Sequence, residues 1–464
     1  METGTEELVS HLKNVFLNLA TNPYPEVACP PDAQRRASVA LVLRIQPNYD
    51  HWPAVQTKHF HPHRSPQRRR SSLASNSEHK LSLKDILDAF FEQDWVKHGD
   101  PEVLFIKRAT RAGDKWNGHV ALPGGKRDPE DEDDQVTAVR EAMEEVGIDL
   151  SFTHAISVGN LPQRIVTASW GKVPLMVLCP YVYLLTSSGY PSQRLQPTEV
   201  ASTHWVPLRA LLTPALRTYE YADVSNRLAK SELGIKRWFL QAMLSKMMFA
   251  AIRLLPSEST YCASIPGFVP EGSPPNTSFL GHVKEILKGP ESAYPTRQQP
   301  LLLWGLTLGV VSDFLEHIPP HNALELWTYP TFTNWDVRFT MWALSYSFRK
   351  RKSLEMSSTK EPIASAAVEE GMDAAEMPKQ DMPEAQAGEA EKPGEVGIAG
   401  LGVGRNWGKA GRAKLIARGA AVNSMLEGYY PIVRKAVATA LVGRITVVSL
   451  LVAYFWTKYN RSRA

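Results

Sequence analysis

Apolar residues recur with two different periods along the chain, and they predict a domain that mixes helices and strands. Near the start, Leu8, Leu12, Val15, Phe16 and Leu19 follow a helical period, which predicts a short amphipathic helix docked on the domain. Short apolar runs without that period predict buried strands at residues 38–45, 102–107, 155–158 and 173–185, with a helix at 83–91. Strands interleaved with helices are typical of the α/β class.

Two further stretches predict helices in the second half of the domain. Residues 236–255 interleave cations with methionine and aromatic side chains, which fits either a core-facing helix or a helix on a membrane surface. A later helix that contains residues 303–307 and continues to about Leu315 is predicted to close the domain.

The most informative pattern is a helix with three carboxylates on one face. Glu141, Glu144 and Glu145 are spaced i, i+3 and i+4, so a helix brings them together. Such carboxylates repel one another, and they are tolerated when water solvates them or when a hard cation such as Mg²⁺ neutralises them. Another face of the same helix is predicted to pack on the core through Val136, Val139, Met143 and Val146.

Three neighbours favour the cation over a merely solvated face. Gly124 and Gly125 follow an apolar run, so a strand ends in a tight turn before the helix. Arg140 lies at i, i+4 to Glu144, where it can hold that carboxylate. Gly147 is placed for a left-handed cap at the end of the helix.

The acidic helix and the loop before it resemble the Nudix box of the Nudix hydrolases, G-x5-E-x7-R-E-U-x-E-E-x-G-U, in which U is a bulky apolar residue. Seven residues separate Glu132 from the Arg-Glu pair at 140–141, and the rest follows in register except that Ala142 replaces the bulky residue. The nearest glycine, Gly125, comes one residue early. The loop before the helix is therefore longer by one residue, and either Glu130 or Glu132 fills the first glutamate of the box.

The resemblance implies an α/β/α sandwich with a mixed sheet, and hydrolysis of a nucleoside diphosphate linked to another group. It also implies a divalent cation, Mg²⁺ with Mn²⁺ as the alternative, which lowers the pKa of a bound water and neutralises charge on the leaving oxygen. By the same resemblance, the metal ligands are Glu141, Glu144 and Glu145, the catalytic residues are Arg140, Glu144 and Glu145, and the substrate-binding residues are Arg108, Gly124 and Gly125. Glu199, near a strand end, is a weaker candidate for the proton acceptor and is interpreted as a surface acid.

Segments before the box narrow the family further. Residues 104–108, and then Gly118 with residues 122–125, are similar to the L-L-T-x-R-S and G-x-x-x-F-P-G-G signature of the coenzyme A pyrophosphatase branch. Here Ala109 replaces the serine and Leu122 replaces the phenylalanine. The resemblance makes coenzyme A or an acyl derivative the leading substrate, with other nucleoside diphosphate derivatives left open.

Composition divides the 464 residues into several segments. The formal net charge of +4 is small for this length, and we expect no nucleic-acid partner. The oligomeric state stays open. We predict an N-terminal helical extension at 1–35 and a Nudix domain at 36–320 that contains large insertions at about 46–80 and 216–299. After the domain we predict an aromatic and basic segment at 321–352, a disordered acidic linker at 353–400, and a basic Gly/Ala-rich segment at 401–435.

The C-terminal part of the chain holds a second strong pattern. Residues 436–456 form an apolar stretch whose only charge is Arg444, close to the roughly 20 residues that span a bilayer. We predict a transmembrane tail anchor with the enzyme facing the cytosol, on the mitochondrial outer membrane rather than the ER or peroxisome. The alternative is a peripheral or buried helix in a soluble cytoplasmic protein. Aromatic residues at 334–348, followed by the basic run 349–352, suit an anionic membrane interface or an extra surface helix.

Two hypotheses about function follow from these patterns. One is a membrane-anchored pyrophosphohydrolase, and the other is a catalytically inactive, membrane-tethered scaffold on the same fold. The complete set of Arg140, Glu141, Glu144 and Glu145 favours the enzyme, because a scaffold does not require three mutually repelling acids.

Overall fold

The fold is described here from a computed structural model of the chain. It describes residues 4–31, 35–53, 82–110, 116–168, 173–222, 246–264, 300–319, 321, 328–360 and 428–462. Most of the predicted insertion at 46–80, of the linker at 353–400 and of the segment at 401–435 lies outside these ranges.

Within the described ranges, nine strands form one sheet. They are β1 (Arg36–Gln46), β2 (Asp100–Arg108), β3 (Val120–Ala121), β4 (Gly124–Lys126), β5 (Ala155–Asn160), β6 (Arg164–Ala168), β7 (Val173–Leu185), β8 (Val200–Pro207) and β11 (Glu258–Tyr261). The hydrogen-bonded order is β11-β8-β2-β1-β7-β5, with β3 on β2, β4 on β1 and β6 on β7. Strand β1 runs parallel to β7 and antiparallel to β2, so the predicted mixed sheet is confirmed.

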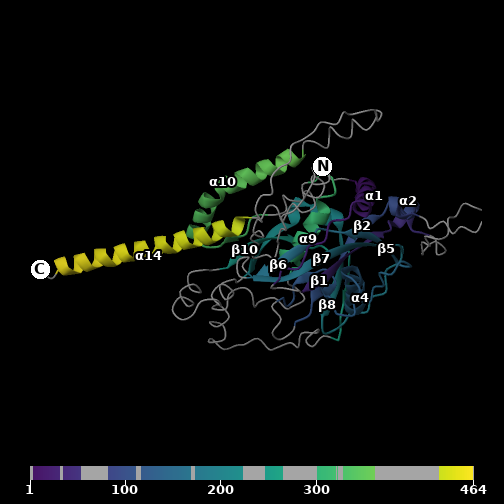
Figure 1. Cartoon of the computed structure of the whole chain (residues 1–464), viewed down its shortest axis with the longest axis horizontal. Helices are drawn as coiled ribbons and strands as arrows, with labels where there is room; N and C mark the ends of the chain where they lie inside the picture. The colour runs from purple at the N-terminus through teal and green to yellow at the C-terminus, as the bar shows by residue number, and fades with distance from the viewer. Residues whose placement is uncertain are drawn as a thin grey trace, which may run out of the picture.

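Helices cover both faces of this sheet (Figure 1). Because side chains alternate along a strand, Ala40 and Val42 of β1 pack with α4 (Asp134–Val146), whereas Leu41 and Leu43 face the other layer. That other layer contains α1 (Thr5–Thr21), α2 (Leu83–Phe91) and α9 (Gly305–Leu315). The shorter helices are η1 (Tyr49–His51), α3 (Asp94–Lys97), α5 (Leu208–Leu212) and η3 (Pro214–Leu216). The arrangement is the predicted α/β/α sandwich.

The N-terminal helix is confirmed in position and in its buried face, because all five of its predicted core residues are buried. The closing helix begins later than predicted. Leu302–Trp304 forms strand β12, and the helix α9 starts at Gly305, whose φ of 65° marks the change of direction.

A second sheet was not predicted. It consists of β9 (Arg217–Ala222), β10 (Met247–Arg253), β12 and β13 (Thr331–Phe332) among the described residues. The predicted helix at 236–255 is therefore wrong where it is described, because β10 pairs with β9 on one side and with β12 on the other. A short run rich in methionine and aromatic residues is compatible with a helix or with a strand, and pairing with the neighbouring strands makes it a strand. The predicted insertion at 216–299 thus contributes strands to both sheets.

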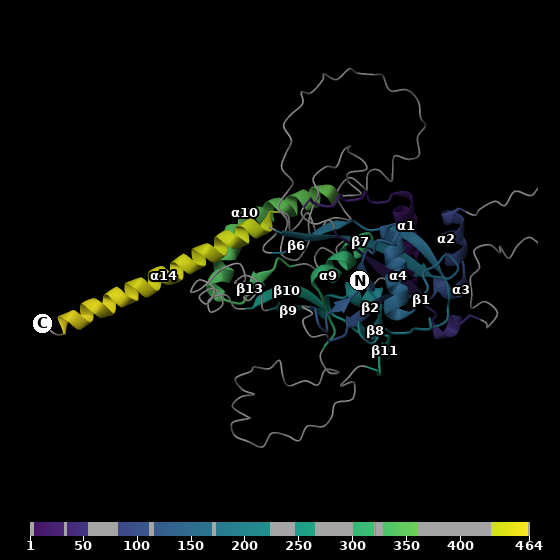
Figure 2. The same ribbon diagram turned by 60° about the horizontal axis from the view of Figure 1, so that its bottom comes forward.

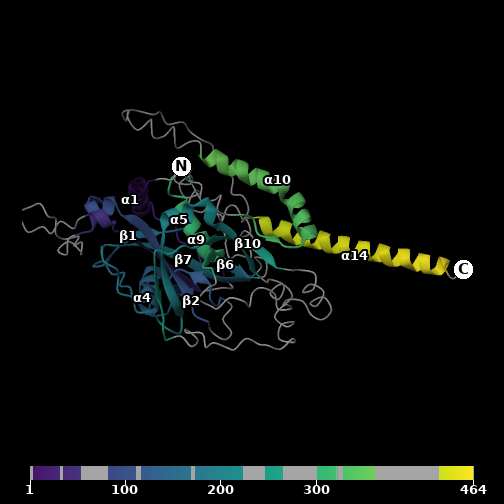
Figure 3. The same cartoon turned by 180° about the vertical axis from the view of Figure 1, so that it is seen from behind.

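Two long helices follow the sheets, α10 (Trp335–Lys360) and α14 (Tyr429–Arg461). The first turns of α14 are buried against the domain, whereas its later part is exposed and extends far beyond the sheets in every view (Figures 1, 2 and 3). By length and composition α14 is the one helix in the described ranges that is able to cross a membrane.

Candidate active site

Helix α4 carries the predicted acidic residues, and its two ends are capped as the sequence requires. The Asp133 carboxylate accepts a hydrogen bond from the Val136 backbone N–H at 2.7 Å, which closes the first turn. Gly147 ends the helix with a φ of 73°, and a Cβ there would lie 2.7 Å from the Arg194 backbone nitrogen. The left-handed cap predicted at Gly147 is therefore confirmed.

The face that α4 turns to the sheet differs from the prediction. Val146 is buried as expected, but Val136 and Met143 are 39% and 54% exposed. The buried positions instead include Ala138 and Ala142. Small side chains let the helix lie close to β1, and this close approach places Glu141 and Glu145 against the sheet, whereas Glu144 is 59% exposed.

Two of the predicted metal ligands meet a third acid. Carboxylate oxygens of Glu141, Glu145 and Glu199 all lie within 4.8 Å of one another. Glu199, interpreted above as a surface acid, immediately precedes β8, where Val200 pairs with Arg108 at the end of β2. Glu144 is not in this group, and its carboxylate accepts a hydrogen bond from Arg140 Nη1 at 2.9 Å. The structure therefore brings together two of the three predicted metal ligands, Glu141 and Glu145, but not Glu144.

Burial dominates the electrostatics of this cluster. Glu145 is 2% exposed, and desolvation raises its pKa to about 8, helped by the nearby charge of Glu141. The Gly124 backbone N–H, which donates to Glu145 Oε2 at 2.8 Å, and the charge of Arg108 both oppose this rise. Burial raises the pKa of Glu141 as well. Gathering several negative charges here is costly unless a cation is present.

The two glycines before the helix are needed for close approach. A Cβ on Gly124, whose φ is 153°, would lie 2.2 Å from the Ser38 carbonyl oxygen of the neighbouring strand. A Cβ on Gly125 would lie 2.3 Å from Glu141 Oε1. Contact distances below 3.0 Å are not observed for real Cβ atoms. The two glycines, predicted to form a tight turn, lie instead in β4, and they set where the Glu141 and Glu145 carboxylates lie.

Arg140 binds more than its predicted partner Glu144. Its Nε and Nη2 donate to the two carboxylate oxygens of Asp131, both at 3.0 Å, and Nη2 also donates to the Lys126 carbonyl at 3.1 Å. Asp131 in turn accepts from the Thr137 hydroxyl at 2.9 Å. These bonds, with that of Arg140 the strongest influence, lower the pKa of Asp131 to about 2.

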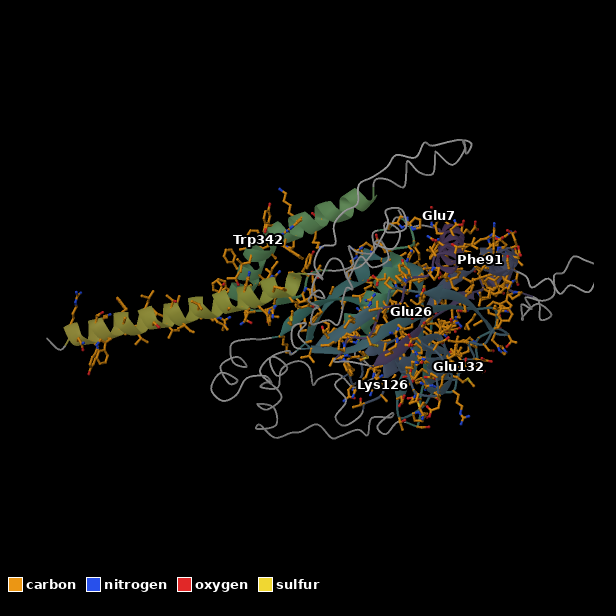
Figure 4. All side chains as sticks on the ribbon, viewed as in Figure 1. Glu7, Glu26, Phe91, Lys126, Glu132 and Trp342 are labelled. Atoms are coloured by element: carbon orange, nitrogen blue, oxygen red, sulfur yellow. The ribbon has the colours of Figure 1, made fainter. Side chains whose placement is uncertain are left out.

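Asp131, rather than Glu130 or Glu132, therefore holds the position next to the box arginine. Five residues separate Gly125 from Asp131, which is the spacing of the box, so the extra residue lies after Asp131 rather than before it. The side chains of Glu130 and Glu132 are both exposed, and Glu132 lies at the outer edge of the domain (Figure 4). Counting forward from the glycine would have identified Asp131; counting back from the arginine did not.

A basic cavity adjoins the same loop. It has a volume of about 510 Å³ and is lined by Cys29, Arg35, Arg36, Lys126, Arg127, Asp128, Pro129 and Asp131. Arg36 is held by Asp134 at 2.6 Å, whereas Arg35 and Lys126 are exposed. Four cationic side chains against two carboxylates give the cavity a net positive lining, which suits an anionic group.

The family model described as the NUDIX domain matches residues 95–227. The chain is 34% identical over 255 residues to an uncharacterized protein of Schizosaccharomyces pombe, covering 54% of this chain and 67% of that protein. It is 40% identical over 72 residues to Nudix hydrolase 15, mitochondrial, of Arabidopsis thaliana, covering 16% of this chain and 24% of the relative.

Another similarity is shorter. It joins this chain to the mitochondrial coenzyme A diphosphatase NUDT8 of Mus musculus, at 40% identity over 60 residues, which are 13% of this chain and 29% of the relative. Among solved structures, the NUDIX domain of Shewanella oneidensis NrtR in complex with ADP ribose is similar with a TM-score of 0.22 and 16% identity, over 40% of this chain and 81% of that one.

Proposed function

Because this chain belongs to the Nudix hydrolase family, we propose that it hydrolyses the diphosphate of a nucleoside diphosphate linked to another group. The observation that carries the proposal is the meeting of Glu141, Glu145 and Glu199 within 4.8 Å, next to the two glycines of β4. Acids brought together from α4 and from the start of β8 give a ligand set of oxygen atoms, the type preferred by hard divalent cations.

The proposed cofactor is Mg²⁺, with Mn²⁺ as the alternative. The residues fit such an ion because Glu145 is 2% exposed and its pKa is raised to about 8, so a cation relieves both its desolvation and its repulsion by Glu141. When bound, the ion supplies a water of lowered pKa and neutralises charge on the diphosphate. Glu141, Glu145 and Glu199 would hold it.

The remaining residues hold the site in shape and accept the proton. Arg140 binds Asp131 and Glu144, so it ties the preceding loop to the helix. The Gly124 N–H fixes one oxygen of Glu145. Glu144 is 59% exposed, lies next to Glu145 and is outside the cation set, and we assign it as the acceptor of the proton from the attacking water.

Coenzyme A or an acyl derivative is the proposed substrate. Three observations support it: the signature before the box, the partial similarity to a coenzyme A diphosphatase, and the basic cavity beside the loop. A substrate with a further phosphate away from its diphosphate would place an anionic group near Arg35 and Lys126.

The test is a hydrolysis assay with the full chain in detergent and Mg²⁺, against coenzyme A, NADH, ADP-ribose and diadenosine polyphosphates. We expect coenzyme A to be cleaved with the highest kcat/KM and Glu145→Gln to lose the activity. The matched control is Glu130→Gln, which changes an exposed acid on the loop. Cleavage of another compound in preference contradicts the substrate assignment. Absence of cleavage across the panel favours the scaffold.

The proposal extends to location. The exposed part of α14, whose uncharged run is Ile445–Thr457, is the proposed anchor, with the catalytic domain in the cytosol at the mitochondrial outer membrane. The buried residues of α14 lie before this run, between Tyr429 and Ala440, and we therefore propose an anchor that begins later than the predicted residues 436–456.

Carbonate extraction of cell membranes tests the anchor, and an N-terminal fluorescent fusion tests the compartment. We expect the full chain to stay in the membrane pellet and to surround mitochondria. Release of the full chain by carbonate contradicts the anchor, and an ER or peroxisomal pattern contradicts the choice of membrane.

A further inference from the structure

Helix α10 presents an aromatic stripe to the outside. Trp335, Phe339, Trp342 and Tyr346 are spaced by four, three and four residues, so they share one face of the helix. Their side chains are 81%, 62%, 56% and 58% exposed. Trp342 lies on α10 beside α14, outside the body of the two sheets (Figure 4). A run of exposed rings on one face marks an interaction surface. The buried residues of the opposite face are Val337, Met341, Ser345 and Phe348.

Three contacts fix the direction of α10 relative to α14. The ring of Phe348 lies 6.2 Å from that of Tyr429, and the Thr340 hydroxyl donates to the Ala436 carbonyl at 3.3 Å. Closer to the free end of α14, Arg444 Nη2 donates to Asp336 Oδ1 at 2.6 Å. The helices are therefore antiparallel neighbours (Figure 2). The bond between Asp336 and Arg444 sets the start of α10 level with Arg444.

Between Arg444 and Lys458, α14 carries no charged residue, has apolar side chains around its circumference and is exposed. Its large apolar side chains there are about half to two thirds exposed, and they are Ile445, Val447, Val448, Leu450, Leu451, Val452, Tyr454, Phe455 and Trp456. A helix with no polar face is stable when lipid or protein surrounds it. The described residues offer no cover for this part of α14.

We propose that the membrane surface meets the protein at the Asp336–Arg444 pair, with Trp335 and Phe339 in the headgroup layer and the span beginning at Ile445. The inference rests on the proposed anchor and adds where the bilayer starts and which surface touches it. Tryptophan and other aromatic rings concentrate at this layer.

The ion pair explains why the membrane boundary lies there. An arginine inside the hydrocarbon core costs about 2.5–3.5 kcal/mol on the insertion scale, and Asp336 already satisfies this guanidinium at the boundary. The uncharged run Ile445–Thr457 is ~20 Å long at 1.5 Å per residue, so Lys458 and Arg461 extend their side chains to the far headgroup layer to bridge the ~30 Å of a hydrocarbon core. Arg338, exposed on α10, is close enough in sequence to the two rings to reach lipid phosphates.

This placement holds the catalytic domain directly against the bilayer instead of on a flexible tether. The first three turns of α14, with Tyr429, Val433 and Ala436 buried, belong to the domain, so the span and the domain share one continuous helix. Because α10 runs antiparallel to α14, depth in the membrane must decrease along the stripe from Trp335 to Tyr346, over ~16 Å.

The test is a depth measurement on the full chain in phosphatidylcholine vesicles containing anionic phosphatidylserine. Single nitroxide labels are attached at Trp335→Cys, Phe339→Cys, Tyr346→Cys and Leu451→Cys, in a chain with Cys29→Ser because Cys179 and Cys262 are buried. Trp52→Cys is the matched control, since Trp52 is 55% exposed and lies on the catalytic domain away from α10. Accessibility to dissolved oxygen is compared with accessibility to a water-soluble nickel chelate.

We expect the label at 451 to be deepest, those at 335 and 339 to lie at the interface, the label at 346 to be shallower, and the label at 52 to lie in water. If the labels at 335 and 339 are as accessible to nickel as the label at 52 while 451 is shielded, the anchor holds and the boundary proposed here is overturned. If 451 is also accessible to nickel, the anchor itself fails.

Discussion

Gly125 and Glu141 lie so close that a Cβ on the glycine would be 2.3 Å from a carboxylate oxygen of the glutamate. Gly125→Ala must therefore push the Glu141 side chain out of the acidic cluster. A displacement of about 1 Å costs on the order of 100-fold in rate in a preorganised site, and we expect a loss of kcat of that size. Gly189→Ala is the control, because its nearest neighbour would be 3.6 Å away. Equal kcat values for Gly125→Ala and Gly189→Ala would show that Gly125 does not position the acidic cluster.

Asp131 should matter more than either glutamate beside it. Asp131→Asn keeps the shape of the side chain but removes the charge that Arg140 binds through two hydrogen bonds. Residues that orient catalytic groups in this way typically contribute 10–100-fold, and we expect a loss in that range with Glu130→Gln and Glu132→Gln near wild type. Steady-state kinetics on the three variants decides. If Glu130→Gln or Glu132→Gln loses more activity than Asp131→Asn, that glutamate, and not Asp131, is the first acid of the box.

His204 links the stability of the domain to pH. Burial lowers the pKa of His204 to about 4, in a site where its ring lies 2.8 Å from the hydroxyls of both Ser202 and Ser259. The folded protein therefore binds fewer protons than the unfolded chain between about pH 6.5 and pH 4, so stability falls as the pH is lowered through this window.

The change due to His204 alone is at most about 1.4 kcal/mol per pH unit. Denaturant unfolding at pH 7 and pH 5 measures it against His204→Gln, which keeps a hydrogen-bonding side chain but does not titrate. We expect the wild type to lose more stability than the variant between these two values. Parallel losses would show that His204 is not held neutral.

The two parts of α14 should respond differently to truncation. Ending the chain after Arg444 removes the exposed apolar run and leaves the buried turns and the Asp336–Arg444 pair in place. Ending it after residue 427 also removes Tyr429, Tyr430 and Val433, each buried, and large apolar side chains contribute about 1.5–3 kcal/mol each when buried. We expect the first protein to unfold at the temperature of the full chain in detergent and the second at a lower one, measured by thermal unfolding. Equal unfolding temperatures would place the whole helix outside the domain.

Local patterns in the sequence predicted the longer strands of the main sheet, the acidic helix and its cap at Gly147, because spacing along one element depends on neighbouring residues alone; they did not predict β6 or β11. They failed where distant segments meet. Glu199 joins Glu141 and Glu145 only because β8 pairs with β2, a relationship that no local pattern contains. The strand at 247–253 depends in the same way on its partners β9 and β12. The exposure of Met143 depends on how closely α4 approaches the sheet, which Ala138 and Ala142 determine.

The central claim is that Glu199 completes a cation site with Glu141 and Glu145. Its most direct test is a Mg²⁺ titration of hydrolysis by the wild type and by Glu199→Gln, with Glu130→Gln as the matched exposed control. Loss of one carboxylate ligand should raise the half-saturating Mg²⁺ concentration on the order of 10-fold or more and lower the maximal rate. A Glu199→Gln enzyme with the Mg²⁺ dependence of the wild type would contradict the account.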